Sequence, residues 1–262
     1  MSDSGRSSSQ EDDVPDLSVQ GAIATIRFRR PAHANRLGPD DLRVLRDHLE
    51  AVDRDERILV LRFCGEGKYF CSGYDISKLS SEAAPSSLYF GETIDQVEQA
   101  RPVTIAIVHG GVYGGGTDLA LACDFRMGSP GANMFMPAVR LGLHFYPRGL
   151  ARYVSRLGLD QAKRLFLTAQ RLEAEEMLRI GFLTDLVPAD QLEGCVEDRC
   201  RLLAGMAPQA LVGTKKHLNL IASGTLDVAA IEAAVRRSEA SSDIREGARA
   251  WKEKRAPVFT GD

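Results

Sequence analysis

A run of glycines at residues 110–116 is the part of this chain best suited to chemistry on an anion. It follows an apolar segment, 103–108, and opens a segment of small and apolar residues that ends at Cys123 and Asp124. Glycine lets a backbone approach a ligand closely, and the N–H groups at the start of a helix attract negative charge. The run therefore predicts a main-chain site for an oxyanion or a phosphate.

The familiar phosphate motifs do not fit this run. A dinucleotide fingerprint needs glycines at i, i+2 and i+5, and although Gly114 and Gly116 fill the first two places, the third is Leu119. The Walker pattern fails because no lysine follows the last glycine. A hydrolase Gly-x-Ser-x-Gly elbow is absent around Ser72. Taken alone, the run is also compatible with a plain packing contact between a strand and a helix.

A second glycine-containing turn, residues 67–76, has the same context as the first. It leaves an apolar segment, 57–63, and leads into a short predicted helix. Two such turns at the ends of neighbouring strands can direct two backbone N–H groups at one point. That arrangement is an oxyanion hole made of main chain alone.

The elements that must position these turns alternate along the first part of the chain. Hydrophobic spacing predicts strands at 22–28, 57–63, 103–108 and 124–128, with helices at 39–54, 85–100 and 115–123. Later segments are helical: 161–168, 174–179, 191–204, 208–221, 227–239 and 243–254. We expect an α/β fold with a disordered N-terminal tail at 1–15, a core at 16–200 and a helical C-terminal region at 201–262.

Composition narrows the class of protein. The chain has 262 residues, 44% of them hydrophobic, and a formal net charge of -3, which gives no basic signal for nucleic acid or a membrane surface. No apolar run approaches the ~18 residues of a membrane helix, and the polar residues 1–13 do not resemble a signal peptide. Five cysteines without a CxxC pair favour reduced thiols and a cytoplasmic protein, and no residue cluster has the spacing of metal ligands.

Together the two turns resemble the crotonase, or enoyl-CoA hydratase/isomerase, superfamily. Its first signature matches Phe-Cys-Ser-Gly-Tyr-Asp at 70–75, and its second matches the segment 110–124, with an extra glycine at 111. Further matches occur at Arg-Pro 30–31, Pro137, Leu-Gly 141–142, Leu-Thr-Ala 167–169, Gly-Phe-Leu 181–183 and the closing segment 253–259. The resemblance covers residues 16 to 260.

The resemblance implies a fold, a substrate and a site. Such proteins have a spiral core of ββα repeats and a helical C-terminal region that builds homotrimers, often paired as hexamers. The substrate is an acyl-CoA thioester, so coenzyme A is part of the substrate and no other cofactor is expected. The thioester oxygen is held by two backbone N–H groups, which map to Tyr74 and Gly115. They stabilise the negative charge that develops as the thioester becomes an enolate.

The resemblance also places the coenzyme A end along two early loops and the C-terminus. The residues implied are Arg30, Asn35, Lys68, Ser72, Asp75, Ile76, Lys254 and Phe259. Lys254 and Phe259 correspond to a basic and an aromatic side chain that family members bring near the nucleotide, sometimes from a neighbouring subunit. A solvated helix end and a packing aromatic are the alternative interpretations of these two residues.

The acid and base residues depart from the family pattern. Hydratases of this family use two glutamates, and this chain has the shorter Asp118 in the first place and Ala138 in the second. Because alanine transfers no proton, we expect the two-carboxylate hydration mechanism to be absent or weak. His144 and Tyr146 are the candidate substitutes. A loop contact for His144, packing for Tyr146 and a helix first-turn role for Asp118 are the structural alternatives.

The sequence thus predicts an acyl-CoA enzyme of the hydratase/isomerase type with atypical acid/base residues. Its catalytic candidates are Tyr74, Gly115, Asp118, His144 and Tyr146. An acyl-CoA decarboxylase of the same family and a non-catalytic acyl-CoA-binding scaffold are the alternatives. A nucleic-acid-binding relative is disfavoured by the acidic charge.

Overall fold

The computed structural model describes residues 13–78 and 87–262. A six-stranded sheet has the order β1-β2-β3-β5-β7-β10, and all of its pairings are parallel except that of β1 with β2. Its strands are β1 (Asp16–Gln20), β2 (Ile23–Phe28), β3 (Val60–Gly65), β5 (Val103–Val108), β7 (Phe125–Gly128) and β10 (Asp185–Leu186). A smaller sheet, β4-β6-β8-β9, joins β4 (Tyr69–Cys71), β6 (Gly111–Tyr113), β8 (Asn133–Phe135) and β9 (Leu172–Glu173).

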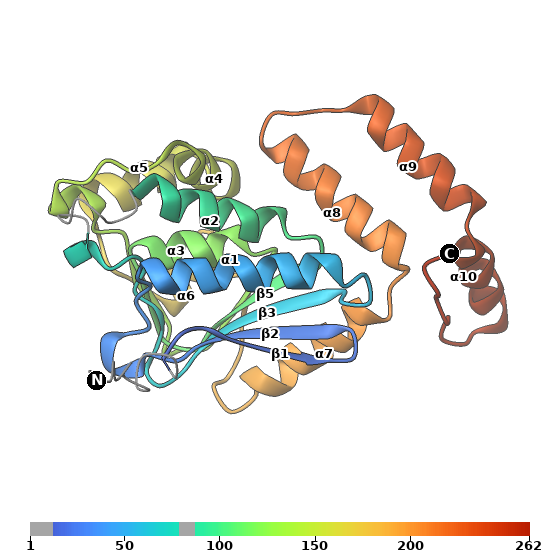
Figure 1. The fold of residues 1–262 in the computed structure, drawn as a ribbon, viewed down its shortest axis with the longest axis horizontal. Coiled ribbons are helices and arrows are strands. Elements are labelled where there is room, and N and C mark those ends of the chain that lie inside the picture. Colours follow the sequence, from blue (N-terminus) through green and yellow to red (C-terminus); the bar gives the residue numbers. More distant parts are fainter. Residues whose placement is uncertain (1–12, 79–86) are drawn as a thin grey trace, which may run out of the picture.

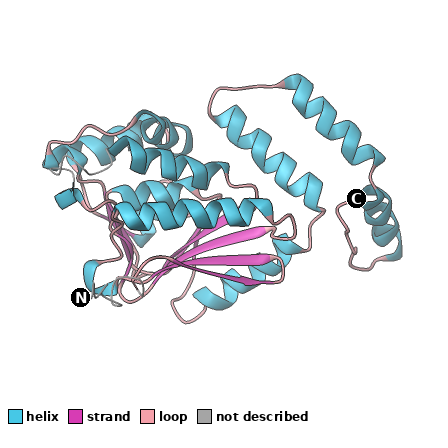
Figure 2. Cartoon of the chain, viewed as in Figure 1, coloured by secondary structure: helices cyan, strands magenta, loops and turns pink. Residues whose placement is uncertain are grey.

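The six-stranded sheet separates two apolar cores. Along β5, Ala106 and Val108 belong to the larger core, whereas Ile105 and Ile107 belong to the smaller one. Both faces of this strand are therefore buried, which explains its unbroken apolar sequence. Helices cover the two faces of the sheet (Figure 2).

The larger core lies under α1 (Pro39–Arg54), α2 (Ser87–Gln99) and α3 (Gly115–Ala122), and α7 (Leu192–Ala204) covers the other face (Figure 1). Helix α1 buries the stripe that its sequence predicts, Leu42, Leu45, Leu49 and Val52. The remaining helices are α4 (Pro147–Leu157), α5 (Leu159–Thr168), α6 (Ala174–Arg179), α8 (Pro208–Ala222), α9 (Val228–Ala240) and α10 (Ser242–Glu253), with short 3₁₀ turns η1 (Pro31–His33), η2 (Ile76–Lys78) and η3 (Ala138–Leu141). No helix in the described ranges is both long and apolar enough to cross a membrane.

The predicted strands and helices are confirmed in place, with shifted ends. The strand predicted at 57–63 begins at Val60, and the helix predicted from residue 85 is described from Ser87 onward, its expected start lying outside the described residues. Sequence patterns did not predict β1, β10, the short strands of the second sheet or helix α4. The strands of the second sheet have two or three residues each, too few to show a period of two, and α4 carries three arginines, one of them buried.

The last three helices form an arm beside the core. Helix α8 lies along the edge of the core, while α9 and α10 extend away from it (Figure 1). Polar contacts dock α8. The Lys215 ammonium lies 2.8 Å from the Asp124 carboxylate and donates to the carbonyl of Pro102, and the Asn219 amide donates to the carbonyl of Glu98. Asp124 also accepts from the backbone and hydroxyl of Thr104 at the start of β5. One half-buried carboxylate thus connects α8 to the central strand.

We predict that Lys215→Ala destabilises the fold by roughly 3 kcal/mol, because it leaves Asp124 inside the protein without its cationic partner. Urea denaturation followed by circular dichroism measures this change. Lys216→Ala, on the exposed side of the same helix, is the matched control. Its free energy of unfolding should stay within about 0.5 kcal/mol of that of the parent protein. Equal stability of the two variants would show that the Lys215 pair does not dock α8.

Candidate active site

The two glycine-containing turns meet backbone to backbone. A Cβ atom placed on Gly73 would lie 2.4 Å from the nitrogen of Gly115, and one on Gly116 would lie 2.3 Å from the carbonyl oxygen of Cys71. Both distances are too short for any side chain. Glycine at these places is therefore required for the turn after β4 to pack against the start of α3.

The local pairing orients the main chain around Tyr74. Leu37 donates from its N–H to the carbonyl of Gly73 and accepts from the N–H of Asp75, a parallel bridge between the early loop and the turn. In such a bridge the N–H of the intervening residue, Tyr74, points away from Leu37. Gly115 is the first residue of α3, so its N–H has no acceptor within the helix.

A pocket of about 270 Å³ opens between these turns and the segment 136–146. Both predicted oxyanion residues, Tyr74 and Gly115, line it, as do the candidates His144 and Tyr146. The rest of the wall is mainly apolar, with Phe90 of α2, Met136, Ala138, Leu141, Leu143 and Phe145. The pocket thus gathers four of the five predicted catalytic residues.

Asp118 lies behind the pocket wall. Its side chain is fully buried in α3 and is not among the residues that line the pocket. Its Oδ2 accepts a 2.6 Å hydrogen bond from the Tyr146 hydroxyl and lies 2.6 Å from the Arg152 guanidinium. The carboxylate is therefore an acceptor held by two partners, and the Tyr146 ring lies at the pocket wall.

Tyr146 is held as a neutral phenol. Burial raises the pKa of Tyr146 well above its usual range, and the negative charge of Asp118 and its hydrogen bond act in the same direction. The ring fits because glycines face it: a Cβ on Gly91 would lie 2.7 Å from the ring, and one on Gly149 would lie 2.6 Å from it. Tyr146 is thus poorly suited to release a proton.

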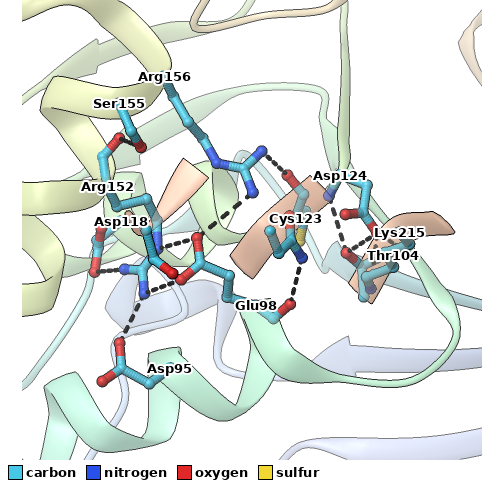
Figure 3. Close-up of polar contacts among 12 residues, drawn as sticks. Asp95, Glu98, Thr104, Asp118, Cys123, Asp124, Arg152, Ser155, Arg156 and Lys215 are labelled. Carbon is cyan, nitrogen blue, oxygen red and sulfur yellow. Dashed lines mark hydrogen bonds and ion pairs between the residues drawn. The ribbon is translucent and has the colours of Figure 1, made fainter. Parts of the chain in front are cut away.

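A charge-balanced cluster surrounds Arg152 (Figure 3). Arg152 contacts Asp95 and Glu98 of α2 as well as Asp118, while Arg148 and Arg156 pair with Asp95 and Glu98. Three carboxylates therefore meet three guanidinium groups. Burial opposes the charge on Arg152, but Asp118 and Glu98 outweigh it and raise the pKa of Arg152. Burial raises the pKa of Asp95, an effect that Arg152 partly offsets.

His144 is an exposed residue at the rim of the pocket, in the loop before α4. Its Nδ1 lies 2.8 Å from the carbonyl oxygen of Phe145, and because a carbonyl only accepts, this nitrogen carries the hydrogen. In the neutral ring the lone pair is then on Nε2. Ala138, at the place of the second family glutamate, is buried in the wall and contributes only a methyl group.

The residues predicted to bind coenzyme A lie in three different parts of the structure. Ser72, Asp75 and Ile76 line the pocket, and Asp75 pairs with Arg36, a lining residue that the sequence analysis did not select. Arg30 pairs with Asp41, and the buried Asn35 amide donates to the carbonyls of Glu66 and Tyr69. These two side chains stabilise the loops beside the pocket.

Lys68 and the two C-terminal residues lie outside this pocket. Lys68 lines a separate hollow with His109 and Arg171. Lys254 follows α10, and Phe259 lies 3.7 Å from where a Cβ on Gly247 would be. Helix α10 is at the opposite end of the molecule from α4 and α5 (Figure 1). Within one copy of the chain, Lys254 and Phe259 therefore do not reach the pocket.

Besides Arg36, two residues important to the site were not predicted from the sequence. Phe90 lines the pocket, and Arg152 holds Asp118. Phe90 falls on the apolar stripe of a predicted helix, where it is indistinguishable from a core residue. Arg152 lies in a helix that the spacing did not reveal, so its burial had no local signal. Among the described residues, no group of three or more His, Cys, Asp or Glu could hold a metal ion.

The sequence profile of the enoyl-CoA hydratase/isomerase family matches residues 18–262. The chain belongs to this family. An enoyl-CoA hydratase/isomerase relative, the (E)-benzylidenesuccinyl-CoA hydratase of Thauera aromatica, is 30% identical over 94% of this chain and 98% of its own. The crotonyl-CoA hydratase of Syntrophomonas wolfei is also 30% identical, over 93% of this chain and 96% of its own.

Solved structures confirm the crotonase-like fold. The crystal structure of an enoyl-CoA hydratase/carnithine racemase from Magnetospirillum magneticum has a TM-score of 0.89 at 27% identity, covering 95% of this chain and 96% of its own. That of an enoyl-CoA hydratase from Bacillus anthracis has a TM-score of 0.86 at 26% identity, with coverages of 95% and 99%. The α/β spiral with a helical C-terminal part is therefore the fold of this hydratase/isomerase family member.

We predict that Gly73→Ala destabilises the protein about 2 kcal/mol more than Gly224→Ala. Both glycines have positive φ, +83° and +84°, but a Cβ on Gly224 meets no atom within 4 Å. The shared backbone strain costs about 1 kcal/mol in each variant, and the collision with Gly115 adds the difference. Chemical denaturation of both variants measures it, and equal losses would contradict the close contact of the two turns.

Proposed function

We propose that this family member acts on acyl-CoA thioesters and stabilises their enolates between the N–H groups of Tyr74 and Gly115. The observation that carries the proposal is the backbone contact between the Gly73 turn and the start of α3, with both residues lining one pocket. Removing one such donor from an oxyanion hole typically costs about 3–4 kcal/mol of barrier. The positive end of α3 adds to the stabilisation of the negative oxygen.

The pocket wall supports a reaction that needs no carboxylate base. Asp118 is bound to Arg152 behind Tyr146, Ala138 has no proton to transfer, and Asp75, the carboxylate among the described lining residues, pairs with Arg36. Hydration and double-bond migration both require a base in or next to the substrate. The same wall therefore favours the second candidate function, decarboxylation.

Decarboxylation generates the enolate without a base. The bond between the α-carbon and its carboxylate breaks, carbon dioxide leaves, and the electron pair passes through the α-carbon to the thioester oxygen. One proton must then reach the α-carbon. We assign this step to His144, whose protonated ring can donate from Nε2 while Nδ1 stays bound to Phe145.

A turnover panel of crotonyl-CoA, a 3-enoyl-CoA and methylmalonyl-CoA distinguishes the reactions. We expect the parent to release carbon dioxide from methylmalonyl-CoA faster than it converts the other two. His144→Gln should lower kcat about 100-fold with little change in KM, the range expected for loss of a general acid. His217→Gln, on α8 and outside the pocket, is the control. Undiminished turnover in His144→Gln would show that another group delivers the proton.

The same panel tests the remaining alternatives. Preferred conversion of crotonyl-CoA or the 3-enoyl-CoA would overturn decarboxylation but retain the acyl-CoA enzyme. Binding of acyl-CoA with no turnover of any member would favour a non-catalytic scaffold. In that case Asp118→Glu combined with Ala138→Glu should introduce hydration if the oxyanion pair is competent.

We also propose a homotrimer or a pair of trimers, assembled through the C-terminal arm. Trp251 of α10 is 88% exposed and Leu218 of α8 is 61% exposed in the single chain. Such an exposed apolar surface is typical of a protein interface. In such an assembly Lys254 and Phe259 would lie near the pocket of a neighbouring copy, although they do not reach the pocket of their own chain.

We predict a particle of three or six times the chain mass in analytical ultracentrifugation. Trp251→Asp should shift the distribution toward the monomer, because a charge at an apolar interface is costly to desolvate. Trp251→Phe keeps an apolar ring and should leave the assembly unchanged. A monomeric parent protein at micromolar concentration would contradict this proposal.

A further inference from the structure

Aromatic rings form a continuous wall of the pocket. Tyr74, Phe90, Tyr146 and Phe145 follow one another with ring centroids 5.8, 6.1 and 4.2 Å apart. All four line the same cavity. Aromatic residues make up 6% of the chain but four of the 17 residues that line this pocket, so the wall is strongly enriched in rings.

The centre of this wall is fixed from behind. The Tyr146 hydroxyl donates to Asp118. Arg152 binds Asp118 and also contacts Asp95 and Glu98 (Figure 3). From the side, Phe145 stacks on Tyr146 with an angle of 26° between their planes. Gly91 and Gly149 pack so closely against the Tyr146 ring that a side chain at either position would collide with it.

A fixed aromatic wall discriminates between acyl groups of similar size. A ring in the substrate gains offset-stacked or edge-to-face contacts worth about 0.5–1.5 kcal/mol beyond the apolar area that it buries. Because the wall is already ordered, little additional entropy is lost on binding. A saturated acyl group buries comparable area but has no such contacts to gain.

The pocket is large enough for an acyl group that carries an aromatic ring. An apolar cavity of about 150 Å³ is enough to hold benzene. The pocket of about 270 Å³ therefore has room for a six-membered ring and the carbons that join it to a thioester. The methyl group of Ala138, where hydratases of this family have a glutamate, keeps that part of the wall apolar.

We infer that the enzyme takes acyl-CoA substrates whose acyl group carries a planar aromatic ring, and that Tyr146, held by Asp118 and Arg152, is the residue that determines this specificity. The inference rests on the proposed acyl-CoA function. Asp118 is a positioning residue in this arrangement, because it acts on the substrate through Tyr146 and does not line the pocket.

Binding of three saturated thioesters tests the inference. 3-Phenylpropanoyl-CoA and 3-cyclohexylpropanoyl-CoA have the same carbon skeleton and differ in the planarity of the ring, while butanoyl-CoA reports the contribution of the shared CoA thioester. We expect isothermal titration to show that 3-phenylpropanoyl-CoA binds about fivefold more tightly than 3-cyclohexylpropanoyl-CoA. Greater hydrophobicity alone would favour the cyclohexyl compound, so this order identifies the ring contacts.

Variants then assign the preference to its residues. Tyr146→Leu should abolish the phenyl-to-cyclohexyl ratio, and Tyr146→Phe, which keeps the ring but loses the bond to Asp118, should reduce it. If Tyr146 has a purely structural role, its substitution should lower the affinity for both thioesters equally and leave the ratio of the two affinities unchanged. Tyr89→Leu removes a ring from the same helix as Phe90 but outside the pocket, and should retain the parent ratio. Thermal unfolding verifies that each variant is folded.

The outcomes separate the two proposals. If none of the three thioesters binds, the proposed acyl-CoA function fails and the inference fails with it. If butanoyl-CoA binds but the cyclohexyl compound binds as tightly as the phenyl compound or more tightly, only the aromatic specificity is overturned. That parent-protein comparison decides the question even if a Tyr146 variant does not fold.

Discussion

The close packing of two turns of main chain is the constraint on which the site depends. The segment around Gly73 and the start of α3 approach so nearly that a Cβ on Gly73 or Gly116 would collide with backbone atoms. The approach is possible because β4 and β6 pair in parallel and deliver both turns to the same edge of their sheet. In the oxyanion hole that we propose, main-chain donors held this way need little reorganisation when the thioester oxygen gains charge.

A second constraint is the set of partners around Asp118 of α3. Arg152 and the Tyr146 hydroxyl both bind its carboxylate. The cluster of three carboxylates and three guanidinium groups compensates the charges, which makes burial tolerable. The result is a pocket whose wall beside α3 is aromatic and neutral.

The same residues shape the pocket wall. With Asp118 behind the wall and Ala138 within it, neither position presents a carboxylate to the pocket. Tyr146 at the same time gives the pocket an aromatic surface. The reaction and the aromatic preference that we propose therefore depend on the same residues.

The C-terminal arm, formed by α8, α9 and α10, is separate from the candidate site. Its helices expose large apolar side chains, and α10, which Lys254 follows, lies at the opposite end of the molecule from α4 and α5. The docking of α8 through Lys215 and Asn219 fixes where the arm leaves the core. The geometry of the arm is therefore set by polar contacts at its base, and its apolar surface remains available for association.

The sequence by itself determined the long elements, the family and the two turns. Their signals are local: β5 is apolar throughout because both faces are buried, α1 repeats its leucines at helical spacing, and the glycines stand where side chains do not fit. Short strands such as β4 and β6 have too few residues to show the alternating pattern of a strand. They form because other strands of the sheet pair with them.

Only the tertiary structure decided what Asp118 touches. Nothing within a few residues of Asp118 indicates that Arg152, 34 positions later, pairs with it, or that Tyr146 lies between it and the pocket. The role of a carboxylate depends on its burial and on the charges around it, and both are properties of packing between α2, α3 and α4. The sequence indicated the residue types of the candidate site, while packing decided which of them face the pocket.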